Sequence, residues 1–227
     1  MKITDLFGSR PDESKLNLLR HNEAGSEPCE MVLNEEHELR LMCGERVLHT
    51  FVCSPAELGE LCAGWLYTEG YGGEALEVSA DGHIAKAYGC AMQAAAAEKM
   101  EPCGEVSATT EEMLGLFSQA SDKYSRSHGI HECVLKGDGW HILRTDIGRH
   151  NAIDKAVGAA LMQGYDLKGA VMFSSGRINI QTVKKAARCK IGCLMSKAVI
   201  TADALALAEE LGLNVLFCVK HGSYITK

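Results

Sequence analysis

Apolar and polar residues alternate through residues 30–53 around a break at Cys43-Gly44-Glu45. This pattern predicts a small antiparallel meander of strands. Ser54-Pro55-Ala56-Glu57 then has the spacing of a helix capping box with proline at the first helical position, so a helix is expected to begin there and end near Gly70. The other elements expected before residue 144 are a strand at 83–88, an alanine-rich helix at 91–100, a helix at 107–126 and a hairpin at 132–144.

The period of the pattern changes after residue 144. Ile153, Val157 and Leu161 recur at four-residue intervals and predict a helix over 151–164. Strands are then expected at 170–173, 191–195 and 213–219, and helices at 179–190 and 202–211. This β-α-β-α-β order predicts a largely parallel sheet covered by helices, whose ligands lie beyond the carboxyl ends of the strands.

Length and composition agree with a folded globular protein. The 227 residues, 46% of them hydrophobic, are enough for one large domain or two modest ones with real cores. The 10 cysteines lie mostly in apolar segments and are expected to be buried thiols rather than disulfides. We expect a cytoplasmic protein without membrane contact, because no apolar run approaches about 18 residues and residues 1–10 lack a signal-peptide core.

Charge is distributed unevenly along the chain. Residues 144–227 carry 12 Lys and Arg against 6 Asp and Glu, whereas residues 1–143 carry 11 against 24. A basic C-terminal part suits a polyphosphate or nucleotide ligand, and the acidic remainder argues against the wrapping of long nucleic acid. Simple variation of surface charge is the alternative explanation.

One candidate phosphate site is Phe173-Ser174-Ser175-Gly176-Arg177, which stands between a predicted strand and a predicted helix. Backbone N–H groups at a helix N-terminus face outward, and glycine allows close approach of the backbone to a ligand. Arg177 can grip a phosphate with two donors. The alternative is an ordinary tight turn with a solvated arginine.

A second candidate is the polar run from Arg144 to Asn151, followed by Asp154 and Lys155. Arg149, His150, Asn151 and Lys155 fall within about two helical turns, so several of them can converge on one ligand. Asp146 could then orient a neighbouring group. A solvated helix entrance, the alternative, would use fewer kinds of functional group.

Cys90 follows a glycine at the start of the predicted alanine-rich helix. Helix N-termini lower the pKa of a thiol, and the accessible thiolate is the form that attacks or carries sulfur. Cys103, between Pro102 and Gly104, is the rival reactive thiol. A buried, inert side chain is the commoner fate of a free cysteine.

A zinc site is the weaker hypothesis for the histidine and cysteine residues near 130. His128, His131 and Cys133 cluster, and His131 precedes Glu132 in a way that is similar to zinc deaminases. The Pro-Cys-x-x-Cys partner of that signature is missing, and the spacing of Cys189 and Cys193 fits a helix that runs into a strand. We expect no zinc. His131 is either a functional residue or a satisfied core histidine.

His131, the run Asp146–Lys155 and Ser175-Gly176-Arg177 resemble the successive signatures of the FdhD family of formate dehydrogenase accessory sulfurtransferases. The segments 38–41, 66–70 and 213–226 match the family in order, so the resemblance covers roughly residues 30–227. It implies an α/β fold, with a cytidine deaminase-like α/β domain at 106–227 that lacks the catalytic zinc. A smaller α+β N-terminal domain at 1–105 would end in the sulfur-carrier loop.

The resemblance also implies a function. Such a protein accepts sulfur from a cysteine desulfurase as a persulfide and passes it to molybdenum or tungsten bis(molybdopterin guanine dinucleotide), which goes to the catalytic subunit of formate dehydrogenase. Family members look like homodimers, and a guanine nucleotide would mimic the cargo. The residues expected to hold the cargo are Arg149, His150, Ser175, Gly176, Arg177, Phe217, Cys218, Val219, Lys220, His221 and Gly222.

The sequence departs from the family pattern at the sulfur carrier. The family has Cys-x-x-Cys, whereas this chain has Cys90-Ala91-Met92-Gln93, and Ala94–Ala97 replaces a glycine-rich loop. Ser196-Lys197-Ala198 likewise replaces Ser-Ala-Pro at the pocket lip. Cys90 matches the persulfide carrier, so single-cysteine transfer is expected.

Two other functions stay open. One is a chaperone that escorts the finished cofactor without moving sulfur, in which case Cys90 is dispensable. The other is a zinc-dependent, deaminase-like enzyme, which elemental analysis would exclude if the purified protein held no zinc.

Overall fold

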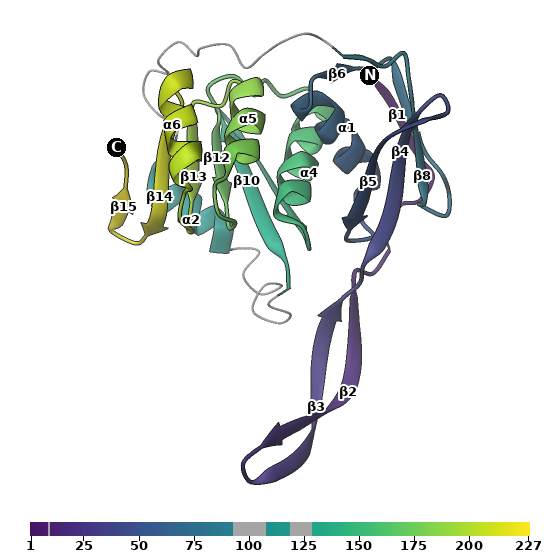
Figure 1. Ribbon diagram of the computed structural model, residues 1–227, viewed down its shortest axis with the longest axis vertical. Helices are drawn as coiled ribbons and strands as arrows, with labels where there is room; N and C mark the ends of the chain where they lie inside the picture. Colours follow the sequence, from purple (N-terminus) through teal and green to yellow (C-terminus); the bar gives the residue numbers. More distant parts are fainter. Residues whose placement is uncertain (9, 93–107, 119–128) are drawn as a thin grey trace.

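The computed structural model describes residues 1–8, 10–92, 108–118 and 129–227 (Figure 1). Two sheets lie on either side of a pair of helices, α1 (Leu58–Thr68) and α4 (Arg149–Met162), and a long hairpin projects from between them. None of the described helices is long and apolar enough to cross a membrane. The predicted domain boundary at 105 lies outside the described residues and stays a prediction.

The N-terminal sheet has the strand order β1-β7-β8-β4-β5. Alternate side chains of its strands face α1, and Leu39, Leu41 and Phe51 form the core with Leu58 and Leu61 of the helix. The predicted hairpin around residue 44 and the strand near residue 84 are therefore confirmed. The strand bounds are Lys2–Asp5 for β1, Ala75–Val78 for β7, Ile84–Tyr88 for β8, His37–Cys43 for β4 and Arg46–Cys53 for β5.

The predicted capping box at the start of α1 is wrong. The helix begins at Leu58 after Glu57, whose left-handed backbone (φ 50°) provides no side-chain cap. Ser54 is buried instead and bonds to the chain segment before α4. Its N–H donates to Asp146 Oδ2 at 3.1 Å, and its hydroxyl accepts from the N–H of Ile147 at 3.2 Å.

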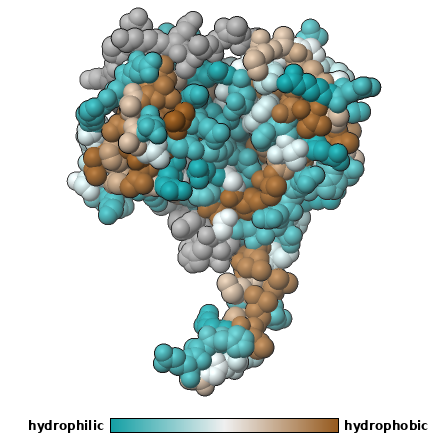
Figure 2. Space-filling model, viewed as in Figure 1, coloured by the Kyte–Doolittle hydropathy of each residue, from teal (hydrophilic) through white to brown (hydrophobic). Residues whose placement is uncertain are grey.

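The projecting hairpin consists of β2 (Glu13–Asn22) and β3 (Gly25–Asn34) and was not expected from the sequence. The sequence predicted that residues 30–34 belong to the meander, but in the structure they belong to this arm. Directly paired residues of an antiparallel ribbon share a face. One face of the arm is apolar and largely exposed (Figure 2), and it carries Leu16, Leu18, Cys29, Met31 and Leu33.

The C-terminal sheet has the order β11-β10-β12-β13-β14-β15. Its three strands β12, β13 and β14 are parallel, whereas β10 runs antiparallel to both of its neighbours and β15 runs antiparallel to β14. The sheet is thus mixed rather than largely parallel as predicted. The bounds are His131–Gly137 for β10, Trp140–Asp146 for β11, Val171–Ser174 for β12, Cys193–Ser196 for β13, Asn214–Lys220 for β14 and Ser223–Ile225 for β15.

Helices cover both faces of this sheet. The helices α4, α5 (Ile180–Arg188) and α6 (Ala202–Leu211) pack on one face, and α2 (Thr110–Ser118) packs on the other. The three helices expected after residue 144 are confirmed, and the helix expected at 107–126 is described at 110–118. The helix expected at 91–100 does not start at Ala91, because Ala91–Met92 form β9, which pairs with β6 (Tyr71–Gly72). Residues 93–100 lie outside the described residues.

Candidate functional site

Several predicted site residues meet at one edge of the C-terminal sheet. The parallel strands β12 and β13 end there at Ser174 and Ser196, which are paired in register. Because β10 runs in the opposite direction, its first residue, His131, lies at the same edge, opposite Asp146 at the end of β11. The edge where the sequence places the ligand is therefore the edge where the polar residues gather.

Ser175 is held firmly by β10. Its hydroxyl accepts from the N–H of Glu132 at 3.0 Å and lies 3.1 Å from Nδ1 of His131. Its own N–H donates to the carbonyl of Glu132 at 3.0 Å, and the N–H of Gly176 donates to the hydroxyl of Ser174. These two backbone N–H groups are used inside the fold, so neither is available to a phosphate. Arg177, whose side chain is exposed, keeps its donors available at this edge.

Gly176 makes room for an arginine. A Cβ atom at this position would lie 2.9 Å from both Cβ and Cδ of Arg149, the first residue of α4. The Nε atom of Arg149 is buried and has no hydrogen-bond partner among the described residues. A buried cationic donor without a partner is costly in a protein alone, so this atom indicates where an anionic or strongly accepting ligand would bind.

The surroundings of both histidines at this edge lower the pKa and so favour the neutral imidazole. Burial and the nearby Arg149 lower the pKa of His131, although Asp146 opposes them. Burial also lowers the pKa of His150, whose Nε2 lies 3.2 Å from Oδ1 of Asn179. Because Asn179 caps α5 through the N–H of Thr182, His150 connects α4 to α5.

Glu132 faces the opposite side of the sheet from His131, since neighbouring residues of a strand alternate. Its side chain is 2% exposed, and its Oε1 atom has no hydrogen-bond partner among the described residues. Burial raises the pKa of Glu132 to about 7, against the opposing effect of Lys197. The sequence pointed to Glu132 only through the similarity to zinc deaminases and to Lys197 only as a departure at the pocket lip, and neither was among the residues expected to hold the cargo.

We expect this carboxyl group to make stability depend on pH. Its folded pKa of about 7 lies above the ordinary value of 4.5, so its contribution is complete below about pH 4.5 and is lost as the pH rises through about 7. In Glu132→Gln, the urea concentration at the unfolding midpoint should change less between pH 5 and pH 8 than it does in the wild type. At pH 8 the free energy of unfolding of the variant should exceed that of the wild type by roughly 1–2 kcal/mol. Parallel pH profiles for the two proteins would contradict the assignment.

The predicted C-terminal segment lies beyond the same edge. Phe217 and Val219 lie on β14 and pack into the cores on either side of the sheet, so the side chain of Val219, 1% exposed, cannot reach a ligand. Lys220 and His221 are exposed. Nδ1 of His221 lies 2.8 Å from Oε2 of Glu111. The other oxygen of Glu111, Oε1, accepts a hydrogen bond from the N–H of Gly222. The N–H of Cys218 donates to the carbonyl of Ala198 at 3.0 Å.

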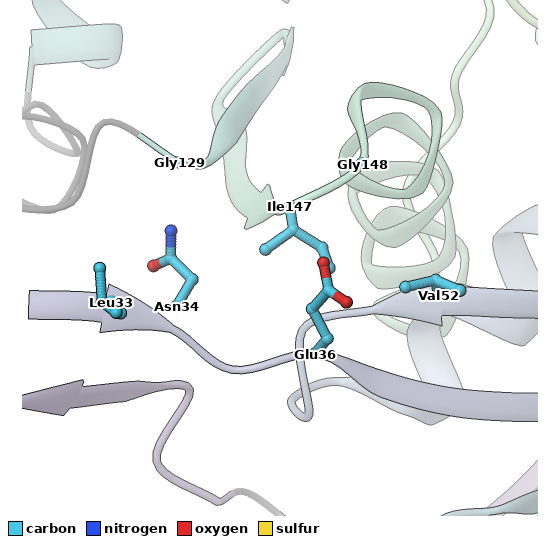
Figure 3. A pocket seen from close by; sticks show the side chains of 7 residues that line it. All are labelled: Leu33, Asn34, Glu36, Val52, Gly129, Ile147 and Gly148. Atoms are coloured by element: carbon cyan, nitrogen blue, oxygen red, sulfur yellow. The ribbon is translucent and has the colours of Figure 1, made fainter.

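A pocket of about 560 Å³ opens next to this edge (Figure 3). It lies between the base of the arm and the loop that precedes α4. Among the residues that the structure describes, none of the predicted cargo residues lines this pocket. The lining residues are Leu33, Asn34, Glu36, Val52, Gly129, Ile147 and Gly148.

Cys90 lies at the other end of the molecule. The start of α1 is beside Asp146 at the polar edge, whereas Gly70, just after the helix, contacts Arg188 at the far end of α5. Cys90 lies near that end, because its sulfur is close to Gly73. The 11 residues of α1 span about 16 Å, so the structure does not bring Cys90 together with the cargo residues.

The expectation of a thiolate at Cys90 is also wrong. The side chain is partly buried, and burial followed by a hydrogen bond with Cys43 raises the pKa of Cys90 to about 11. No helix N-terminus lies at Ala91 to oppose this effect, because β9 follows instead. Cys103 and His128 lie outside the described residues.

The described residues contain no group of three or more histidine, cysteine, aspartate or glutamate side chains placed to hold a metal. Cys133 and Cys189 are buried in the core, where burial raises the pKa of each thiol. Zinc ligation needs thiolates, so neither side chain is prepared for it.

Fold and site together define an α/β protein with a polar edge at its strand ends and, apart from it, the half-buried thiol of Cys90. The sequence profile of the FdhD/NarQ family matches residues 77–225, and the chain belongs to the FdhD/NarQ family. It is 28% identical over 223 residues to a sulfur carrier protein FdhD of Halalkalibacterium halodurans, covering 82% of this chain and 83% of the relative. The sulfur carrier protein FdhD of Staphylococcus aureus is 26% identical over 83% of this chain and 84% of its own length.

A solved structure has the same fold. It is a protein of Desulfotalea psychrophila described as a formate dehydrogenase accessory protein, with a TM-score of 0.83 and 21% identity. The superposition covers 95% of this chain and 97% of that chain.

Proposed function

We propose that this protein carries sulfur for formate dehydrogenase, with Cys90 as the carrier. Cys90 accepts sulfur from a cysteine desulfurase as a persulfide, and the protein hands it on to molybdenum or tungsten bis(molybdopterin guanine dinucleotide). The observation that carries the proposal is the half-buried state of Cys90. Among the described cysteines, Cys29, Cys43, Cys90 and Cys218 are half-buried and the other five are buried. Of these four, Cys90 stands where the family has its carrier thiol.

The test of this proposal is intact-protein mass spectrometry after incubation with a cysteine desulfurase and cysteine. We expect one sulfur adduct on the wild type and on Cys103→Ser, and none on Cys90→Ser. The thiolate is the attacking form, and the raised pKa of Cys90 makes it scarce at pH 7, so loading should accelerate as the pH rises toward 9. An adduct that survives in Cys90→Ser and is lost in Cys103→Ser would assign the chemistry to Cys103.

The cargo is proposed to bind at the polar edge of the C-terminal sheet. The unpartnered Nε of Arg149 and the exposed guanidinium of Arg177 supply donors for the diphosphate of a guanine dinucleotide. The imidazole of His131, whose lowered pKa favours the neutral form, adds a further polar group. We also propose that this part of the chain has the cytidine deaminase-like arrangement, in which helices cover a mixed sheet.

Arg177→Ala should weaken binding of a guanine nucleotide such as GDP. Losing charge-assisted hydrogen bonds costs about 1.5–3 kcal/mol, or roughly tenfold or more in affinity. Lys168→Ala removes the same charge from an exposed loop away from this edge and is the matched control. Calorimetry that gives the two variants equal affinities would exclude Arg177 from the site.

A second candidate function is escort of the finished cofactor without sulfur transfer. Two observations favour it: glutamine stands at position 93 where the family has a second cysteine, and the pKa of Cys90 is raised rather than lowered. Under this function Cys90→Ser would support formate dehydrogenase maturation as well as the wild type does, while Arg177→Ala would not.

We propose that the protein acts in the cytoplasm as a homodimer. An isolated two-stranded ribbon is marginally stable in water, so the apolar face of the β2–β3 arm needs a covering surface. We propose that a second copy of the chain provides this covering surface, because another copy is always present in solution. Light scattering should give twice the chain mass of 24.5 kDa, and a value of one chain mass would contradict the dimer.

A further inference from the structure

A second thiol lies beside Cys90. Strand β4 ends at Cys43 and pairs in parallel with β8, where Cys43 is opposite Ala87. The chain then passes Gly89, whose φ of +65° turns it, and reaches Cys90. This register and the turn at Gly89 bring Cys90 close to the end of β4, and the thiol of Cys43 contributes to the raised pKa of Cys90. Residues 47 positions apart in the sequence thus place two sulfur atoms together.

Both thiols are accessible in part. Cys43 and Cys90 are each half-buried, and Cys90 packs at the rim of the core that α1 forms with the N-terminal sheet. Other cysteines near that core, Cys53 and Cys62, are buried. A donor molecule that reaches Cys90 therefore reaches a place where two sulfur atoms, and not one, can react.

We propose that Cys43 is the second thiol of the sulfur carrier and takes the sulfane sulfur of a Cys90 persulfide by exchange within the chain. This inference rests on the proposed function of Cys90. Cys43 would supply from β4 the thiol that Gln93 does not supply.

The exchange is balanced and needs no oxidant. The thiolate of Cys43 attacks the outer sulfur of the Cys90 persulfide, and a bond forms between Cys43 Sγ and that sulfur. The bond between Cys90 Sγ and the outer sulfur breaks, and Cys90 leaves with the electron pair. Cys90 then takes up the proton that Cys43 released, so one persulfide and one thiol remain and there is no net oxidation or reduction.

Proximity favours this exchange over escape of the sulfur. Two groups held in contact react with a high effective concentration, which a free thiol in solution does not match. The pairing of β4 with β8 fixes the two thiols on neighbouring segments of one rigid sheet, so the exchange needs no large movement of the chain.

The experiment loads the protein with a cysteine desulfurase and cysteine labelled with a sulfur isotope. Free thiols and persulfides are then trapped by alkylation, and the label is located by peptide mass spectrometry. The proteins compared are the wild type, Cys90→Ser, Cys43→Ser, Cys43→Ala and Cys29→Ser, in which the changed residue lies on the arm. Thermal unfolding confirms that each variant is folded.

We expect label on both Cys43 and Cys90 in the wild type and in Cys29→Ser. Both Cys43 variants should keep label on Cys90, and Cys90→Ser should lose it from Cys43. Label confined to Cys90 in the wild type would overturn the exchange and leave the carrier function intact. Undiminished label on Cys43 in Cys90→Ser would also overturn it, and no label on Cys90 in any protein would contradict the carrier function and the exchange together.

Discussion

Alanine at Gly64 or at Gly158 is expected to destabilise the protein by about 4 kcal/mol or more, because both glycines lie where helices α1 and α4 touch. A Cβ at Gly64 would overlap the backbone carbonyl of Asp154, and a Cβ at Gly158 would overlap that of Glu60. Both overlaps are far inside the 3.0 Å that real Cβ atoms keep. Backbone cannot rotate aside as a side chain can, so the helices must separate.

Separation of the helices would also break a buried polar network. Lys185 Nζ on α5 lies 2.9 Å from Asp154 Oδ1 on α4 and 2.8 Å from the hydroxyl of Thr68 on α1. These contacts join the three helices. Burial raises the pKa of Asp154, although Lys185 opposes this effect, so the carboxylate depends on its partners.

The matched control is Gly115→Ala in α2, where an added Cβ would meet nothing within 4 Å. It should stabilise the protein by about 0.5–1 kcal/mol, since alanine is the better helix former. Urea unfolding followed by circular dichroism separates the two cases. A Gly64→Ala protein that unfolds at the urea concentration of the wild type would show that the two helices are not in close contact.

Lys155→Met should cost about 3–5 kcal/mol, the usual effect of leaving one partner of a buried ion pair behind. Lys155 Nζ lies 2.7 Å from Asp146 Oδ2, and both side chains are 0% exposed. Asp146 also accepts from the N–H of Ser54, from the N–H of Gly148 and from Nδ2 of Asn151. Without the ammonium group, a buried carboxylate would be left uncompensated.

A double variant tests that reason. Replacing Asp146 together with Lys155, as Asp146→Asn with Lys155→Met, removes both charges and should recover part of the lost stability. The loop from Asp146 to Gly148 sets the start of α4, so the single variant should also weaken guanine nucleotide binding through Arg149. Equal stability of the single variant and the wild type would mean that the pair is not buried.

Much of the C-terminal sheet could be predicted because its helices and strands are buried on one or both sides and show a clear period. The arm could not be predicted, because a ribbon without a buried face shows no such period in its sequence. The same holds for β15, which is fully exposed. The antiparallel pairing of β10 with β12 was missed, since a hydrophobic pattern does not tell parallel from antiparallel pairing. Ser54 was misinterpreted because its bonds go to Asp146 and Ile147, which are about 90 residues away in sequence.

The sequence predicted in part which of the polar residues lie close together. Arg149 and Gly176 do come together at the strand ends, as the motifs suggest, but Asn151, Asp154 and Lys155 bond inside the protein. Their polar density in the sequence therefore reflects the junction of α4 with α1 as much as a ligand site. The contact of Cys43 with Cys90 depends on pairing of β4 with β8, which no local spacing of residues reveals.

We propose chemistry at two separate places, the thiols near the far end of α1 and the polar edge at the strand ends. The central claim is that sulfur passes from these thiols to formate dehydrogenase. The most direct measurement is a chase of labelled sulfur. Protein loaded with labelled persulfide is washed, mixed with formate dehydrogenase that was made without the carrier, and both proteins are analysed for label. The account predicts that label leaves Cys90 and appears in the enzyme as formate oxidation begins, and that Cys90→Ser transfers none. Activation of the enzyme by Cys90→Ser, or label that stays on the carrier while activity rises, would contradict it.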